Sequence, residues 1–252
     1  GLFICCLSLL FITKARVQQH LDIALYMKSR FSRLTFFIQI AREIMSTALA
    51  NTVVVLDFET TGLSPGQGDR AIEIGAVRIE NGHISERFSA LMNPGFNVSS
   101  FIEQYTGISN AMLKQAPPCG EVMADFVKFI GDDNLVAHNA SFDKRFLDAE
   151  IEDVGALSWA VRLLLAAVET VIPEAPNHKL ATLVQYQNLP NDGVFHRALA
   201  DAEVTAHLWL ALLKELECRH GIFNPDFELL LTLGKKSKHA VQSFLQGYVT
   251  KK

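Results

Sequence analysis

The sequence predicts an α/β domain whose mixed central β-sheet begins as an antiparallel meander and is flanked by α-helices. Two patterns lead to this prediction. Shortly after residue 50, three apolar segments are joined by short stretches of turn residues, as in strands connected by tight turns. Further on, an amphipathic helical stripe at 121–130 is followed by a short apolar strand at 135–137 and then by another helix. That order is typical of an α/β crossover, so we expect a mixed sheet.

The strands are predicted from apolar runs that end at turn residues. The first begins at Val53, and the small residues and flexible turn at 60–62 end it. Asn81 and Gly82 form a hairpin-type turn between the second and third strands. The expected strands are 53–59, 71–80, 84–91 and 135–137.

The helices are predicted from apolar residues at helical spacing. They are 99–113 with an interruption at Thr106 and Gly107, 121–130, one that begins near Asp143, 159–171, 180–186, and one that ends near Leu216. Residues after Arg219 are less patterned and include a lysine cluster at 235–238, which predicts a mobile tail. The chain therefore divides into a hydrophobic and amphipathic helical extension (1–50), a main domain (51–218) and a basic tail (219–252).

The N-terminal extension begins with the most apolar stretch of the chain, residues 2–12. This stretch is too short to span a bilayer as a helix, and it lacks the basic segment and cleavage site of a signal peptide. A helix docked on the domain and a partner-binding segment are the favoured interpretations, and a membrane-surface anchor stays open. Residues 14–45 predict one or two amphipathic helices. We expect no stable membrane span.

Charge is distributed unevenly along the 252 residues. The segment 51–218 carries eleven Lys and Arg against twenty-three Asp and Glu, a balance of −12, whereas 1–50 and 219–252 each carry +4. An acidic domain does not bind a polyanion by charge alone, so cations would have to neutralise such a site. The four cysteines have no Cys-x-x-Cys spacing, which favours reduced thiols and a cytoplasmic location.

Asp57 and Glu59 stand two residues apart on the first predicted strand. Side chains at that spacing share a face of the strand, so the two carboxylates project the same way. Two carboxylates beside an apolar core repel each other, and a bound divalent cation removes that cost. An edge strand with two solvated acids is the alternative interpretation.

Three further residues have ordinary interpretations when each is taken alone. Asp143 opens a helix after a later strand, where an acid suits the helix dipole. His196 precedes Asp201 by five residues, and these two could be a loop histidine and a solvated helix residue. The residues of three motifs, and the order of those motifs along the chain, favour a joint functional interpretation instead. Asp-Phe-Glu-Thr-Thr-Gly, His-Asn-Ala-Ser-Phe-Asp and His-Arg-Ala-Leu-Ala-Asp-Ala occur in that order between 57 and 202.

Together these motifs resemble the three exonuclease motifs of the DEDDh branch of the DnaQ-like 3′→5′ exonucleases, the family of the DNA polymerase III epsilon subunit. The resemblance covers roughly 51–216 and implies an RNase-H-like fold. It implies that Asp57, Glu59, Asp143 and Asp201 hold metal and that His196 is the general base. The implied cofactors are two divalent cations, Mg²⁺ or Mn²⁺, which prefer oxygen ligands.

The same motifs suggest residues that contact the substrate. Backbone and hydroxyl groups of the first motif would hold the terminal nucleotide, and residues of the second motif would orient Asp143 or line the path of the strand. Structural support of the two turns is the equal alternative. The residues are Phe58, Thr60, Thr61, His138, Asn139 and Phe142.

We therefore expect a metal-dependent 3′→5′ exonuclease that acts on single-stranded DNA and releases nucleoside 5′-monophosphates, in proofreading or repair. An exoribonuclease that trims RNA or oligonucleotides is the close alternative, because the motifs do not fix recognition of the ribose 2′-OH. A catalytically silent nucleic-acid-binding module is the alternative of another class. Candidate partners are a DNA polymerase, another replication or repair protein, and a second copy of the chain. Residues 242–248 resemble a clamp-binding peptide only weakly.

Overall fold

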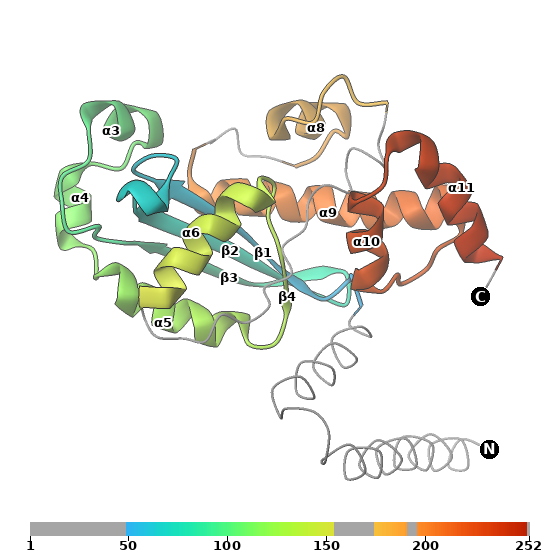
Figure 1. Ribbon diagram of the computed structural model, residues 1–252, viewed down its shortest axis with the longest axis horizontal. Helices are drawn as coiled ribbons and strands as arrows, with labels where there is room; N and C mark the ends of the chain where they lie inside the picture. The colour runs from blue at the N-terminus through green and yellow to red at the C-terminus, as the bar shows by residue number, and fades with distance from the viewer. Residues whose placement is uncertain (1–48, 154–173, 191–195, 251–252) are drawn as a thin grey trace, which may run out of the picture. The chain divides into compact units, whose positions relative to one another are not determined.

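The computed structural model describes residues 49–153, 174–190 and 196–250. Its centre is a four-stranded sheet with the order β3-β2-β1-β4 (Figure 1). β1 pairs antiparallel with β2, β2 pairs antiparallel with β3, and β4 joins β1 in parallel. The mixed sheet that opens as a meander is thus confirmed. The strands are β1 (Val53–Thr60), β2 (Ala71–Glu80), β3 (His83–Leu91) and β4 (Asn134–Val136).

Helices cover both faces of the sheet. Even-numbered residues of β1, such as Val54 and Leu56, pack into a core with α5 and α6, whereas Val53 and Val55 pack into a second core with α8 to α11. Figure 1 shows α5 and α6 on one side of the sheet and the long helix α9 on the other. The helices are η1 (Pro65–Gln67), α3 (Ser100–Thr106), α4 (Asn110–Gln115), α5 (Cys119–Ile130), α6 (Ala140–Asp153), α8 (Leu180–Tyr186), α9 (Ala198–His220), α10 (Phe227–Gly234) and α11 (Lys238–Val249).

Local chemistry explains several of these boundaries. Asn81 and Gly82 both have positive φ, 51° and 80°, which the tight turn between β2 and β3 requires. The side chain of Ser99 accepts the backbone N–H of Ile102 and begins α3, and Gly107 ends this helix with φ 72°. The interruption predicted at Thr106 and Gly107 therefore separates α3 from α4.

The predicted mobile tail after residue 219 is wrong. This segment forms α10 and α11, and their apolar residues complete the core on the α9 side of the sheet. Phe227, Leu230 and Leu245 are fully buried there. Residues ahead of β1 also join this core, since the buried Ala50 accepts a hydrogen bond from the indole of Trp209. The folded domain thus extends beyond the predicted limit at 218.

Two expectations fall outside the described residues. One is the N-terminal extension, including the apolar stretch 2–12, and the other is the helix expected at 159–171. Within the described residues, no helix has both the length and the apolar character needed to cross a membrane.

Candidate active site

The C-terminal half of β1 places two carboxylates on the α9 side of the sheet. Val53 and Val55 belong to the core on that side, and Asp57 and Glu59 continue the same alternating series. Glu59 is only 8% exposed. The prediction that these two acids project from one face of the strand is therefore confirmed by the burial of their neighbours.

Asp143 lies in the first turn of α6. The carbonyl of Asn139 accepts the backbone N–H groups of Phe142 and Asp143, which starts the helix and turns the carboxylate inward. Asp143 is 1% exposed, and neither of its carboxylate oxygens makes a hydrogen bond within the described residues. Burial raises the pKa of Asp143 to about 7, although the nearby backbone N–H groups of Asp143 and Phe58 oppose the shift.

Asp201 and His196 are brought to the site by the start of α9. Asp201 lies in the first turn of this helix, and its Oδ2 accepts the backbone N–H of His196 at 3.1 Å. His196 has φ 63°, a conformation that is uncommon for a residue with a side chain. The bond to Asp201 fixes this backbone, and His196 remains exposed to solvent.

An ion pair between the buried carboxylate of Glu73 and the partly exposed Arg197 fixes the start of α9 on β2. The carboxylate of Glu73 accepts hydrogen bonds from Nε and Nη2 of Arg197 and from the backbone N–H of Ala198. Its side chain is 2% exposed. Gly75 lets the helix approach, because a Cβ there would lie 2.1 Å from the backbone nitrogen of Leu199.

Burial and neighbouring acids raise the pKa of Asp57 and of Glu59. The pKa of Asp57 lies well above its ordinary value, first because of burial and then because of Asp143, Asp201, Glu59 and Glu73. Burial raises the pKa of Glu59 to about 8, with further contributions from Asp201 and Glu73, while Arg197 lowers it. All four acids predicted from the motifs are therefore close enough to interact.

The residues fit a divalent cation. Ligand atoms of Glu59, His196 and Asp201 lie within 4.8 Å of one another. The buried oxygens of Asp143 make no hydrogen bond of good geometry among the described residues, and a cation would satisfy them. Carboxylate oxygens are hard ligands of the kind that Mg²⁺ and Mn²⁺ prefer.

The substrate-contacting residues expected in the first motif have structural contacts. The side chain of Phe58 is 4% exposed and packs with α5 and α6, so its backbone is the part left for a ligand. The hydroxyl of Thr60 donates to the carbonyl of Gly62, and that of Thr61 accepts the backbone N–H of Arg70. These contacts hold the turn after β1, as the structural alternative expects.

The second-motif residues differ in exposure. Asn139 is exposed, His138 is half-buried, and Phe142 packs against Phe146 with ring centroids 4.9 Å apart. The pKa of His138 is lowered first by burial and also by the neighbouring His178. Phe142 thus supports α6, while Asn139 is open to solvent.

Sequence reasoning missed the residues that hold the motifs in place. Glu73 and Gly75 interrupt an apolar strand, and that interruption was the available signal. Glu150 was also missed. It is 1% exposed, and it pairs with Arg70 and accepts the backbone N–H of Ala71, which ties α6 to the start of β2. These contacts position Asp143 and Asp201 relative to β1.

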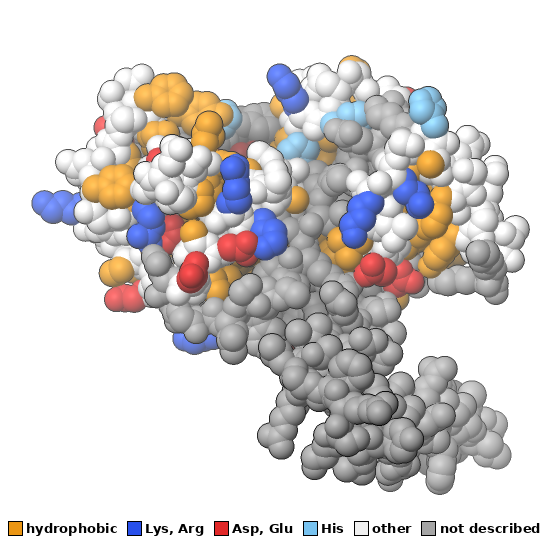
Figure 2. Space-filling model, in the orientation of Figure 1, with side chains coloured by type: hydrophobic (Ala, Val, Ile, Leu, Met, Phe, Trp, Pro, Cys, Tyr) orange, Lys and Arg blue, Asp and Glu red, His pale blue; other side chains and the backbone are white. Residues whose placement is uncertain are grey.

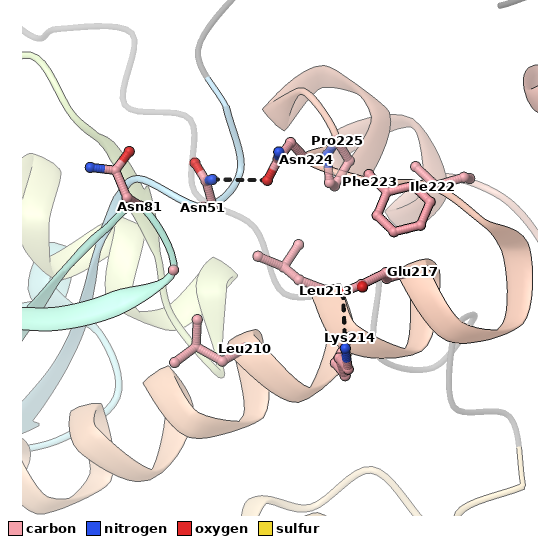
Figure 3. A pocket seen from close by; sticks show the side chains of 11 residues that line it. Asn51, Asn81, Leu210, Leu213, Lys214, Glu217, Ile222, Phe223, Asn224 and Pro225 are labelled. Carbon is pink, nitrogen blue, oxygen red and sulfur yellow. Dashed lines mark hydrogen bonds and ion pairs between the residues drawn. The ribbon is translucent and has the colours of Figure 1, made fainter.

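A hollow of about 370 Å³ lies at the other end of the sheet, near the start of β1. Figure 3 shows Asn51, Asn81 and the loop 222–225 around it, with the outer face of α9 as its floor. Its carboxylate, Glu217, is paired with Lys214. Because it has no cluster of acids, the hollow offers no metal chemistry of the kind found at the end of β1.

A mixed sheet with two acids on its first strand and one at the start of each of two helices defines the class as RNase-H-like nucleases of the DEDDh type. Comparison with known proteins agrees. The RNase T-type model described as Exonuclease matches residues 54–209. The chain belongs to this exonuclease family.

The curated relatives are larger proteins. The PolC-type DNA polymerase III of Bacillus subtilis is 41% identical over 167 residues, which are 65% of this chain and 12% of that protein. The 3′-5′ exonuclease DinG of Bacillus subtilis is 40% identical over 165 residues, which are 65% of this chain and 18% of that protein. The chain therefore matches less than a fifth of the length of each.

Solved structures show the same fold. Exonuclease X in complex with 5′ overhanging duplex DNA has a TM-score of 0.56 and 22% identity, covering 72% of this chain and 99% of that chain. The nuclease domain of 3′hExo, a DEDDh family member bound to rAMP, has a TM-score of 0.57 and 19% identity, covering 66% of this chain and 92% of that chain. The predicted RNase-H-like fold is thus confirmed.

Proposed function

We propose that the chain is a metal-dependent 3′→5′ exonuclease that hydrolyses phosphodiester bonds at the 3′ ends of single-stranded DNA and releases nucleoside 5′-monophosphates. One observation carries this proposal. Asp57, Glu59, Asp143 and Asp201 converge from β1, α6 and α9 beside the exposed His196, and the other three acids, together with burial, raise the pKa of Asp57. Carboxylates this close together repel one another and do not stabilise the fold unless a cation binds them.

The four carboxylates would hold two divalent cations, Mg²⁺ or Mn²⁺. When bound, the cations supply the positive charge that stabilises both ends of an in-line phosphoryl displacement. His196 acts as the general base and takes a proton from the attacking water, since an imidazole titrates near neutrality. Its exposure leaves the ring accessible to water and substrate.

Residues around His196 position it for this role. Its backbone N–H is held by Asp201, and the next residue, Arg197, is held by Glu73. Phe58, Thr60, Thr61, His138 and Asn139 would contact the terminal nucleotide through backbone or polar groups, with Phe142 supporting them. These are proposals that rest on the motif match and on the nearness of these residues in sequence to the acids.

One of the two curated relatives is a DNA polymerase, and this favours DNA as the substrate. In both relatives the matching domain is a small part of the protein. A role in proofreading or repair follows as a proposal, with a polymerase or another replication protein as the partner. An exoribonuclease is the second candidate, since a structural neighbour is bound to rAMP. A homodimer and a cytoplasmic location stay predictions from the sequence.

Digestion of 5′-end-labelled single-stranded DNA, duplex DNA and RNA of the same sequence tests the proposal. We expect stepwise shortening from the 3′ end with Mg²⁺ or Mn²⁺, none with EDTA, and single-stranded DNA as the fastest substrate. Asp201→Asn is the matched control and should be inactive at unchanged melting temperature. Faster cleavage of RNA would select the second candidate. Activity in EDTA or in Asp201→Asn would contradict the assigned site.

A further inference from the structure

Helix α6 carries a second buried acid besides Asp143. Glu150 lies seven residues after Asp143, so the two share a face of the helix about two turns, or roughly 10 Å, apart. Both are 1% exposed. The outer face of α6 is different, because Lys144 and Asp148 form a half-exposed pair there, and Figure 2 shows charged side chains at the surface where Figure 1 places this helix. Glu150 is therefore a charged residue on the inward face.

The start of β2 supplies three hydrogen-bond donors to the carboxylate of Glu150. Its Oε1 accepts Nε of Arg70 and the backbone N–H of Ala71, each at 3.0 Å. Its Oε2 accepts Nη2 of Arg70 at 2.6 Å. Two parallel bonds between a guanidinium and a carboxylate fix direction as well as distance. The contact therefore sets where this part of α6 lies along β2 and how the helix is rotated.

Arg70 continues this contact to the turn after β1. Its backbone N–H donates to the hydroxyl of Thr61 at 3.0 Å, and its carbonyl accepts the backbone N–H of Thr61 at 2.9 Å. Thr61 follows Glu59 by two residues, and the pairing of β1 with β2 shifts register directly after Glu59. A continuous series of hydrogen bonds thus leads from α6 to the end of the strand that carries two of the site's acids.

A carboxylate is a costly choice for this position, because a buried charge loses its hydration. Apolar packing of α6 is already supplied by Phe146, Leu147 and Ile151, which are all buried. Apolar contacts have no preferred direction, so they leave a helix free to shift slightly, whereas directed hydrogen bonds fix one arrangement. Ligands of a metal ion must be placed to within about 0.5 Å. The directed contact is therefore suited to a helix that carries such a ligand.

We propose that Glu150 is a positioning residue for the metal site and that it acts through Asp143. By holding α6 on the start of β2, it sets the place of the Asp143 carboxylate relative to the acids of β1. This inference deepens the proposed function and rests on its metal site. Glu150 itself binds no cation, since its oxygens are taken by Arg70 and Ala71.

A Mn²⁺ titration of the full chain, followed by electron paramagnetic resonance in the absence of substrate, tests the inference without turnover. Glu150→Gln keeps the size of the side chain and removes the charge that holds Arg70. We expect the dissociation constant for Mn²⁺ to rise roughly 10-fold. Ile151→Val is the matched control, because it removes one methylene from the core beside Glu150 and leaves the hydrogen bonds intact. It should lower the melting temperature and leave the Mn²⁺ affinity unchanged.

A double-mutant cycle identifies the route of the effect. In an Asp143→Asn background, Glu150→Gln should raise the dissociation constant for Mn²⁺ by less than about 2-fold, because the ligand that it positions is already lost. Arg70→Lys keeps the charge but removes the two-pronged contact, so it should weaken Mn²⁺ binding in the wild-type background as well. This variant replaces Glu150→Gln if the latter does not fold.

Three results would overturn the inference. They are an unchanged Mn²⁺ affinity in Glu150→Gln and Arg70→Lys, an equal loss of affinity in Ile151→Val, and the same fold-change in the Asp143→Asn background as in the wild type. Absence of Mn²⁺ binding by the wild-type chain would be a different failure, because it would contradict the metal site of the proposed function itself.

Discussion

Asp57 is the residue whose surroundings say most about the site, because it is half-buried and lies near four other acids. The two that the sequence placed beside it, Glu59 and Asp143, titrate at about 8 and about 7. Such groups favour the protonated form near neutral pH, or a bound cation that allows them to ionise. The free energy needed to ionise these carboxyls in the folded protein is the strongest physical sign of a metal site among the described residues.

The raised pKa values predict how stability depends on pH. In the unfolded chain these carboxyls titrate near their ordinary values of 3.8 and 4.5, whereas in the folded protein Asp143 and Glu59 titrate at about 7 and 8. Between those limits the folded protein binds more protons than the unfolded chain, so the free energy of unfolding falls as pH rises. Without metal, we expect the melting temperature to fall from pH 5 to pH 8.

Thermal unfolding in EDTA and in Mn²⁺ checks this prediction. Mn²⁺ should raise the melting temperature more at pH 8 than at pH 5. Asp143→Asn is the control, and its melting temperature in EDTA should change less with pH. A melting temperature in EDTA that stays constant or rises over this range would show that ionisation of these carboxyls does not destabilise the folded protein.

His196→Ala tests the general base. We expect the rate constant of the chemical step to fall by about 10²- to 10⁴-fold, because proton transfer loses its positioned acceptor. Single-turnover rates measured from pH 5 to pH 9 should also lose the limb that reports the imidazole. An unchanged pH–rate profile would assign the base to another group.

The motif residues could be predicted because each motif is local in sequence and carries its own chemistry. Glu73 and Gly75 are marked only as interruptions of an apolar strand; their roles could not be predicted, because their partners, Arg197 and Leu199, lie more than 120 residues further on. No local pattern in the sequence of β2 indicates that a helix packs so closely against it. The sequence thus predicts which acids lie together and misses the residues that position them.

At the scale of elements, the start of α9 is the part that most needs positioning. Its first turn carries Asp201, the preceding residues carry His196, and the buried carboxylate of Glu73 holds both to β2. We expect this contact to orient the start of the helix more than it stabilises the fold, because the guanidinium of Arg197 is partly exposed to water.

Glu73→Gln should therefore lower kcat roughly 10- to 100-fold with a smaller change in KM, because a misplaced His196 affects chemistry before binding. Steady-state kinetics on single-stranded DNA measures this split. Glu86→Gln is the matched control, since Glu86 also pairs with an arginine of β2 but is 60% exposed. If both variants lose activity equally, or neither does, Glu73 has no positioning role.

Helices α10 and α11 are the elements that the sequence did not predict. α10 is apolar at most positions, so it lacks the alternation of polar and apolar faces that marks a surface helix. Lys235 and Lys236 lie in the connection to α11, Lys238 begins that helix, and this cluster of lysines is typical of an exposed tail. Its helical start is visible only through Asp226, whose side chain accepts the backbone N–H of Leu229.

Leu245→Ala tests whether α11 is part of the core. Leu245 is fully buried, so its truncation should lower the free energy of unfolding by about 2–5 kcal/mol. Val249→Ala, one turn later in the same helix and 45% exposed, should lower it far less. Urea unfolding followed by circular dichroism gives both values. Similar values for the two variants would show that α11 is not part of the core.

At the scale of the whole molecule, sequence and structure agree on a mixed sheet with helices on both faces and differ on where the domain ends. The meander and the crossover were predictable, because hairpin turns and strand alternation are short-range signals. The end of the domain depends on long-range contacts such as that between Leu49 and Asp226, which no local pattern reports. The family match ends at residue 209, so it does not report them either.

Anomalous diffraction from crystals of the chain soaked in Mn²⁺ tests the central claim most directly. The account predicts Mn²⁺ peaks about 2.0–2.3 Å from carboxylate oxygens of Asp57, Glu59, Asp143 and Asp201. Peaks held only by other residues, or no peak among these four side chains, would contradict it.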